Sequence, residues 1–428
     1  MQYKRVKGMS DIFLPEVTNW QFVEDEARLF FKARLYEEIR TPVVEYTELF
    51  QRSIGEVTDI VSKEMYTFCD RGERSLTLRP EMTVSIVRAV IENNLLGIRE
   101  PLKLFYSGPM FRAERPQAGR KRQFYQIGVE VIGNDSPFCD AEVIRDLVFF
   151  LERLGLERDA CTVKLNNIGC PQCRPAFLKK LREFFTTQKE SLCESCQVKF
   201  EKNVLRIFDC KNKECKEIAA GAPKVSDNVC EGCREHFTAV EKGLMLFQIP
   251  YTIDKNIVRG LDYYTSTVFE VTSKKLGAQD AIAAGGRYNN LLRELGGEDK
   301  SAIGFALGVE RLLVCLEDSL KKNPSSVLER TVYVAYGDNA YIDQAKQILA
   351  RLEALGYATY ADLDKRSLKS QLKRANKFGL RWVLILNQDE VERGTYQLKD
   401  LRSLDVDQCL IFDKSFEANI RASMSTEE

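Results

Sequence analysis

Five cationic side chains lie in one short segment between two apolar runs of the sequence. The stretch LFYSGPMFRAERPQAGRKRQFYQIGVEVIG covers residues 104–133, and its basic residues are Arg112, Arg115, Arg120, Lys121 and Arg122. Arginine presents a rigid fork of donors that binds phosphate bidentately and keeps its charge at physiological pH. The apolar runs on both sides predict two buried strands joined as a hairpin. We therefore expect the hairpin to direct positive charge at one anionic target; the alternative is a solvated loop with surface arginines.

A second group of polar residues stands at the entry of an alternating strand. The segment RGLDYYTSTVFEV (259–271) places four of them, Arg259, Asp262, Tyr263 and Tyr264, at the start of the predicted strand Thr265–Val271. The segments AAGGRYNNLL (283–292) and SAIGFALGVERLL (301–313) follow it.

Together these motifs resemble histidyl-tRNA synthetase, a class II aminoacyl-tRNA synthetase. The resemblance is carried by FRAERPQ, GRKRQF, RGLDYYTSTVFE, AGGRY and GFALGVERL, and extends through KGMSDIFLPE (7–16), EIRTPVVE (38–45) and LTLRPEMT (76–83). It covers almost the whole chain, and so many motifs in the right order are highly specific. It implies ATP-dependent ligation of L-histidine to tRNA(His), through a histidyl-adenylate, with release of AMP and pyrophosphate.

The resemblance also implies, position by position, which residues act in this reaction. Arg112 and Arg259 would be catalytic, because each supplies a fixed cation at the α-phosphate, where negative charge builds. The ATP-binding residues would be Arg112, Phe124, which is suited to stack on adenine, and Arg311, near the terminal phosphate. Mg²⁺ is expected with ATP, because the polyphosphate needs its charge neutralised.

Recognition of the amino acid needs a different set of residues. The family-matching positions for histidine are Glu81, Thr83, Arg112, Gln126, Glu130, Arg259, Tyr263 and Tyr264. Glu81, Thr83 and Gln126 suit the α-ammonium, while Glu130 and Tyr264 can hydrogen-bond the two imidazole nitrogens. Alternation puts Gln126 and Glu130 on one strand face. The alternative for Glu130 is a paired carboxylate in a hydrogen-bonded core.

Eight of the 13 cysteines fall between residues 170 and 233, in closely spaced pairs. The pairs are Cys170 with Cys173, Cys193 with Cys196, Cys210 with Cys215, and Cys230 with Cys233. Two such pairs can complete a four-thiolate zinc site. We expect one or two structural Zn²⁺ ions, with the pairing left open. A metal-free insertion is the alternative, because the resembling family does not generally need a metal there.

The pattern of elements predicts an α+β fold. Strands alternate with helices, without a regular βαβ rhythm, through about residue 165 and again from about 247 to 322, which favours an antiparallel sheet backed by helices. By resemblance this is the class II catalytic domain, residues 1–325, interrupted by a helical cysteine-rich insertion at 167–245. A helix over 19–36 and a strand over 40–46 are expected, in a region that forms part of a homodimer interface in the family.

A third unit follows the polar linker KKNPSSVLER (321–330). Predicted strands at 331–336, 382–387 and 408–412, with helices at about 340–355 and 367–378, argue for a small α/β domain of parallel type. By resemblance this domain, residues 329–424, binds the anticodon. Lysines spaced every four residues from Lys365 to Lys377 suit an anionic backbone, and a solvated helix face is the alternative.

Composition limits the remaining classes. Lys+Arg and Asp+Glu both number 63, so nucleic-acid binding must rest on local patches. The single histidine, His236, removes multi-histidine metal sites. The absence of a signal peptide and of long apolar runs predicts a cytoplasmic protein without a membrane segment.

Two alternatives from other functional classes were weighed against the ligase. The first is a histidine-sensing regulatory subunit of ATP phosphoribosyltransferase, which shares the fold but tends to lack the anticodon domain and to degrade the arginine set. The second is a zinc-ribbon nucleic-acid binder, which explains residues 170–233 alone. Two positions depart from the family pattern, since Ala113 and Tyr125 stand where it often has histidine.

Overall fold

The computed structural model describes residues 3–55, 58–117, 119–208, 210, 212–257, 261–277, 280–322, 331–362, 366–401, 407–411 and 416–424. They form two compact units, Met1–Ser319 and Leu320–Glu428. None of the helices within these ranges is both long enough and apolar enough to cross a membrane.

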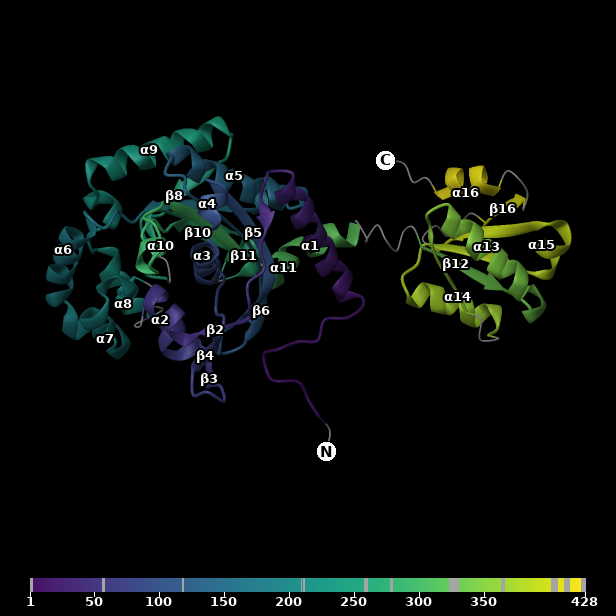
Figure 1. Ribbon diagram of the computed structural model, residues 1–428, viewed down its shortest axis with the longest axis horizontal. Helices are drawn as coiled ribbons and strands as arrows, with labels where there is room; N and C mark the ends of the chain where they lie inside the picture. Colours follow the sequence, from purple (N-terminus) through teal and green to yellow (C-terminus); the bar gives the residue numbers. More distant parts are fainter. Residues whose placement is uncertain are drawn as a thin grey trace. The chain divides into compact units, whose positions relative to one another are not determined.

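An eight-stranded, mostly antiparallel sheet forms the centre of the first unit (Figure 1). Its strands are β1 (Glu37–Glu38), β5 (Leu102–Phe111), β6 (Gln123–Ile132), β7 (Thr162–Asn167), β8 (Tyr251–Ile253), β9 (Thr265–Thr272), β10 (Ala281–Arg287) and β11 (Ala302–Gly308). They lie in the order β1-β5-β6-β11-β10-β9-β7-β8, and only the outer pairs β1–β5 and β7–β8 are parallel. The predicted α+β fold and its arginine-bearing hairpin, β5–β6, are confirmed.

A small three-stranded sheet contacts helix α2 (Thr47–Ile54). Its strands are β2 (Val44–Tyr46), β3 (Tyr66–Cys69) and β4 (Ser75–Leu78), in the order β2-β4-β3. The strand expected over 40–46 is therefore confined to its last three residues.

Helices cover the large sheet. Those outside the insertion are α1 (Glu16–Lys32), α2 (Thr47–Ile54), the π-helix η1 (Ile60–Glu64), α3 (Thr83–Glu92), α4 (Leu95–Ile98), α5 (Pro137–Arg153), α10 (Leu291–Glu294) and α11 (Val309–Lys322), with 3₁₀ turns η2 (Arg158–Ala160) and η6 (Lys274–Leu276). Helix α1 ends earlier than the sequence predicted, because the chain turns at Leu35, which has a φ of 64°. Phe31 of α1 packs against Phe150 of α5 and against Phe105 and Phe305 of the sheet. One face of the sheet is thereby closed.

The cysteine-rich insertion is helical, as predicted. It contains α6 (Arg174–Thr186), α7 (Glu194–Lys202), α8 (Lys213–Ala220) and α9 (Glu231–Leu246), with 3₁₀ turns η3 (Lys189–Ser191), η4 (Val204–Ile207) and η5 (Val225–Asn228), drawn in teal in Figure 1. Phe177, Leu181 and Phe185 of α6 bury their side chains in the same hydrophobic cluster as residues of the large sheet. The insertion therefore shares one core with the sheet.

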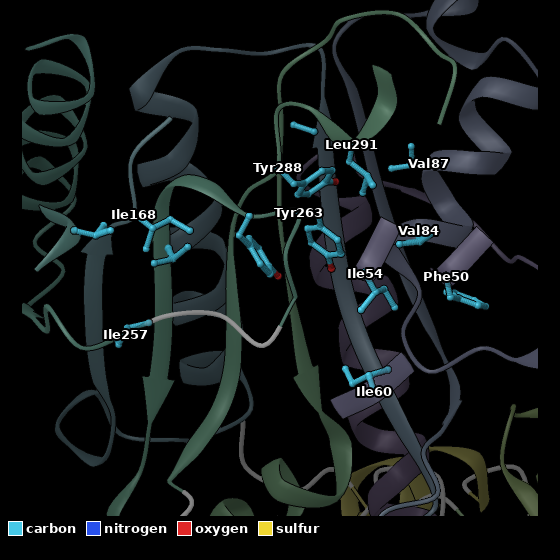
Figure 2. Close-up of a cluster of buried hydrophobic side chains, with 14 of the residues drawn as sticks. Phe50, Ile54, Ile60, Val84, Val87, Ile168, Ile257, Tyr263, Tyr288 and Leu291 are labelled. Carbon is cyan, nitrogen blue, oxygen red and sulfur yellow. The ribbon is translucent and has the colours of Figure 1, made fainter. Parts of the chain in front are cut away.

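Figure 2 shows part of that core. The rings of Tyr263 and Tyr288 lie among Ile54, Val84 and Leu291, which come from α2, α3 and α10. The two tyrosine ring centroids are 5.8 Å apart. Apolar packing from three helices thus holds the tyrosines in place.

The second unit contains a five-stranded sheet in the order β13-β12-β14-β15-β16. Its elements are β12 (Thr331–Tyr336), η7 (Asn339–Tyr341), α13 (Ile342–Ala354), β13 (Ala358–Ala361), α14 (Leu368–Lys377), β14 (Trp382–Leu386), α15 (Gln388–Arg393), β15 (Thr395–Asp400), β16 (Asp407–Ile411) and α16 (Phe416–Met424). The sheet is mixed, not purely of parallel type: β12, β13 and β14 are parallel, whereas β15 and β16 are antiparallel additions. The six-residue α15 is too short for a crossover, and Gly394, with a φ of 65°, reverses the chain.

Candidate active site

A cleft of about 300 Å³ lies over the face of the large sheet opposite Phe31. Small residues on adjacent strands make room for it, since Gly128 pairs with Ala306, and Ala306 with Ala284. A Cβ atom on Gly304 would collide with the carboxylate of Glu130. The floor of the cleft therefore depends on residues without bulky side chains.

Glu81 lines the cleft and is fixed by the first turn of α3. Its two carboxylate oxygens accept hydrogen bonds from the backbone N–H groups of Thr83 (2.8 Å) and Val84 (2.9 Å). The hydroxyl of Tyr263 donates to the same carboxylate at 3.4 Å. Burial raises the pKa of Glu81 above its ordinary value, and the backbone hydrogen bonds oppose that shift. The carboxylate is therefore held in one orientation toward the cleft.

Glu130 lies one layer below the cleft surface. Its carboxylate accepts hydrogen bonds from the hydroxyls of Thr83 (2.7 Å) and Tyr288 (2.6 Å), and the residue is only 1% exposed. It is not among the residues that line the cleft, whereas Thr83 is. Burial raises the pKa of Glu130 to about 8. Its nearest partners are thus two hydroxyls of the protein, which is the hydrogen-bonded arrangement given above as the alternative for this residue.

Two buried polar atoms beside the cleft lack a partner among the described residues. They are the amide oxygen Oε1 of Gln126 and the hydroxyl of Tyr106. Gln126 is a predicted site residue, and Tyr106 pairs with Gly128 on the neighbouring strand. Buried polar atoms are normally hydrogen-bonded. These two atoms are therefore available to a bound ligand.

Cationic side chains also line the cleft. Arg112 donates its Nε–H to the carbonyl of Pro80 (2.9 Å), and its guanidinium carbon lies 5.1 Å from the centroid of the Phe124 ring. Arg311 donates to the carbonyl oxygens of Gly119 and Ala281. Burial lowers the pKa of both guanidinium groups, which nevertheless stay charged at neutral pH. A buried cation gains most from an anionic ligand.

The other basic residues of the hairpin differ in position. Arg120 and Lys121 line the cleft, and Arg120 pairs with Glu114 at 2.9 Å. Arg122 donates to backbone carbonyls and Arg115 is exposed, and neither lines the cleft. Only part of the hairpin charge is directed at this space.

The predicted residues are largely brought together. The cleft is lined by Glu81, Thr83, Arg112, Phe124, Gln126, Tyr263, Tyr264 and Arg311. Arg259 lies outside the described residues. The lining also contains residues that the sequence analysis did not select: Tyr106, Glu114, Leu261, Glu270 and Glu310. All five stand inside the quoted segments, but only Tyr106 and Glu270 lie on strands, so strand alternation could have indicated only those two.

The eight insertion cysteines form two separate clusters. One contains Cys170, Cys173, Cys230 and Cys233, and the other Cys193, Cys196, Cys210 and Cys215. Within each cluster all four sulfurs lie within 4.8 Å of one another, and neighbouring sulfurs in the first are 3.7 to 4.0 Å apart. Such distances are too long for disulfides. Tetrahedral zinc with Zn–S bonds of about 2.3 Å requires sulfur separations of about 3.8 Å, so the donor set fits.

Comparisons with known proteins agree with this arrangement. A family model described as histidyl-tRNA synthetase matches residues 8–312, and one described as an anticodon binding domain matches residues 331–418. The chain is 48% identical over 402 residues to a histidine–tRNA ligase of Desulfitobacterium hafniense, covering 94% of both chains.

Solved structures are similar as well. The crystal structure of apo Staphylococcus aureus histidyl-tRNA synthetase superimposes with a TM-score of 0.78 at 31% identity, covering 98% of this chain and 99% of that one. A Bacillus halodurans protein described as an ATP phosphoribosyltransferase regulatory subunit/histidyl-tRNA synthetase superimposes with a TM-score of 0.65 at 22% identity, covering 90% of this chain and 99% of that one. The second match shows a shared fold only.

Proposed function

The chain belongs to the histidyl-tRNA synthetase family and is an ATP-dependent histidine–tRNA ligase, and we propose that the cleft forms histidyl-adenylate with the residues described above. The observation that carries this proposal is the combination of acceptors and cations in one cleft. Glu81 and Gln126, which can accept hydrogen bonds, line the same cleft as the guanidinium groups of Arg112 and Arg311.

One set of lining residues would bind the amino acid. Glu81, Thr83 and Gln126 would accept hydrogen bonds from the α-ammonium group, and the unpartnered Oε1 atom of Gln126 supports this role. Tyr263 and Tyr264 would border the imidazole ring. Because Glu130 already accepts bonds from Thr83 and Tyr288, its proposed contribution to imidazole recognition would pass through that network unless ligand binding opens it.

A second set of lining residues would bind ATP. Phe124 would stack on adenine, Arg311 would contact the terminal phosphate, and Arg112 would contact the α-phosphate. The carboxylate of histidine attacks the α-phosphorus, a P–O bond forms, and pyrophosphate leaves. The terminal ribose hydroxyl of the tRNA then takes the histidyl group and releases AMP. Arg112 and Arg259 are proposed to stabilise the charge that develops in the first step.

Mg²⁺ is proposed to enter with ATP. In the part of the chain that the structure describes, only the cysteine clusters bring three or more metal-binding side chains together. The phosphates would therefore supply most of the ligands, and the carboxylates of Glu114 and Glu270 in the cleft wall are proposed to approach the ion as well. The ion would neutralise charge on the polyphosphate.

Zinc is proposed as the occupant of both cysteine clusters, with a structural role. Its support is the four-thiolate donor set and the sulfur spacing. Purified protein should contain about two equivalents of zinc, and a Cys170→Ser/Cys230→Ser variant about one. Less than about a tenth of an equivalent in the wild type would contradict this role.

The remaining parts of the proposal rest on the family. They are the domain division at 1–325, 167–245 and 329–424, anticodon binding by the C-terminal unit, a cytoplasmic location and a homodimer. Exposed apolar residues in the expected interface region, Leu29 and Val44, support the dimer. Sedimentation at micromolar concentration would test it, and a monomer would contradict it.

ATP–pyrophosphate exchange tests the central proposal. Each of the twenty amino acids is offered in turn, and exchange is expected with histidine alone. Arg112→Ala and Arg259→Ala are each expected to lower the exchange rate by roughly 10²-fold, since loss of one transition-state contact costs about 3 kcal/mol. Arg99→Ala, which removes an exposed arginine paired with Glu37, serves as the control. Rates within threefold of wild type for either test variant would contradict the assigned role of that arginine.

A further inference from the structure

Two arginines of the insertion hold the cleft segment Leu261–Tyr264. Arg206 of η4 forms an ion pair with Asp262, at 2.6 Å between Nη2 and Oδ1. Arg174, the first residue of α6, donates a 2.6 Å hydrogen bond to the backbone carbonyl of Tyr264. Arg206 is 9% exposed, so its charge has been removed from water to make this contact. Both ends of the segment are therefore tied to the insertion.

Each of these arginines stands next to a cysteine cluster. Arg174 follows Cys173 directly in the sequence. Arg206 lies in the stretch between Cys196 and Cys210, whose ends are brought together by the second cluster. Asn203, from the same stretch, also donates to Asp262, at 3.2 Å. The two clusters therefore define where the two guanidinium groups lie.

Strand β7 joins the first cluster to the chain on either side of the segment. The side-chain amide of Asn166 donates to the carbonyl of Ile257 at 2.8 Å, just before the segment. Just after it, the backbone N–H of Ser266 donates to the carbonyl of Gly169 at 2.9 Å, and Cys170 is the next residue. Movement of the cluster would thus be transmitted to the segment from both sides.

The far side of Asp262 is closed by α2. The backbone N–H of Asp262 donates to the carbonyl of Ile54 in α2 at 3.2 Å. Gly55, with a φ of 98°, lies so close that a Cβ atom there would collide with the Asp262 carboxylate. Asp262 is therefore held between the end of α2 and the insertion, and Leu261, Tyr263 and Tyr264 are placed in the cleft wall.

We propose that Arg206 and Arg174 are positioning residues of the active site. Through them, the insertion supports from outside the part of the cleft wall that is proposed to bind histidine. Neither arginine lines the cleft itself; they act through Asp262 and the Tyr264 carbonyl. This inference rests on the proposed function, because it assigns the segment Leu261–Tyr264 to adenylate formation. It is distinct from zinc binding, which would keep the insertion folded.

The test compares Arg206→Ala with two other variants. Arg206→Lys keeps a cation that can reach Asp262, and Arg182→Ala removes an arginine of the same insertion that donates to the carbonyl of Phe200 and does not touch the segment. For Arg206→Ala, kcat of histidine-dependent exchange is expected to fall by about 10- to 100-fold, the cost of a small displacement of reacting groups. The KM for ATP should stay within about threefold of wild type, because the proposed ATP contacts, Arg112, Phe124 and Arg311, are unchanged.

Three further readouts separate positioning from a merely structural role. Zinc content and the urea midpoint of Arg206→Ala should match wild type, because Asp262 is 35% exposed and water can solvate it. Amide hydrogen exchange should accelerate in the peptide that contains residues 261–264 and remain unchanged in β5. Arg206→Lys should recover most of the lost kcat. Combining Arg206→Ala with Asp262→Asn should cost no more than the larger single effect.

The outcomes are distinguishable. Wild type without histidine-dependent exchange would overturn the proposed function itself. Wild type with exchange, and Arg206→Ala within threefold of it, would overturn only the positioning role. Equal losses in Arg206→Ala and Arg182→Ala would also overturn it, because damage to the insertion would then be general. Additive effects of the Arg206 and Asp262 substitutions would do the same.

Discussion

Replacement of Glu130 by glutamine should change how the stability of the catalytic unit depends on pH. Glu130 is 1% exposed, and burial raises its pKa from 4.5 to about 8. Between these pH values the native state keeps a proton that the unfolded chain has released. The free energy of unfolding therefore falls as pH rises, by up to about 1.4 kcal/mol per pH unit, and levels off above the pKa of the native state. The side chain of Glu130→Gln is neutral throughout and lacks this contribution.

The expected magnitude follows from that difference. Between about pH 5.5 and pH 7.5, the stability of Glu130→Gln should rise relative to wild type by about 2 to 3 kcal/mol. The measurement is urea unfolding followed by tryptophan fluorescence in a Trp382→Phe background. The chain has two tryptophans, and the remaining one, Trp20, is buried in the catalytic unit. The difference between the two proteins cancels the titration of all other groups.

A second variant tests the same network from its donor side. The Tyr288 hydroxyl lies 2.6 Å from the Glu130 carboxylate and favours its ionised form. Tyr288→Phe should therefore destabilise the unit by about 1 kcal/mol at low pH and by about 2 kcal/mol above pH 8. If wild type and Glu130→Gln show parallel stability curves over the whole range, Glu130 does not titrate there, and the reasoning from burial is refuted.

Two further predictions concern packing and buried charge. Gly304→Ala should destabilise the catalytic unit by about 1 to 3 kcal/mol, because the new Cβ atom collides with the Glu130 carboxylate. In the control Gly232→Ala, the new Cβ atom meets no atom within 4 Å, so the substitution should be neutral or stabilising. Equal losses of stability for the two variants in the same urea assay would contradict the argument from the collision. Arg287→Met should cost about 3 to 5 kcal/mol in that assay, because it leaves buried Asp140 without the guanidinium that lies 2.6 Å away. The exposed pair Arg293–Asp299 is the matched control, and Arg293→Met should cost less than about 1 kcal/mol; a loss below that level for Arg287→Met would refute the argument.

The motifs predicted much of the candidate site, because several residues that line the cleft stand on a few strands with regular alternation. The hairpin β5–β6 was expected from apolar runs on both sides of a basic segment, and it carries Arg112, Phe124 and Gln126 into one cleft. Strand β9 was expected from its alternating pattern. Local periodicity fixes which residues share a strand face, so this information is present in the sequence.

Other features depended on contacts between distant segments. The pairing of the eight cysteines could not be read from their spacing, because the first cluster joins residues 63 positions apart, from Cys170 to Cys233, and all four cysteines of the second lie between them. The mixed order of the C-terminal sheet followed from a short helix and a reversal at Gly394, not from the strand pattern.

The sequence alone determined the family, the kind of fold and eight of the residues that line the cleft, because side-chain chemistry and local periodicity are properties of short segments. Only the tertiary structure decided how Glu130 is used and how the insertion reaches Asp262. Both depend on partners far away in the chain: Thr83 and Tyr288 in one case, and Arg206 in the other. The burial and hydrogen bonds that set the properties of such groups come into being when distant segments pack together, and no spacing rule encodes them.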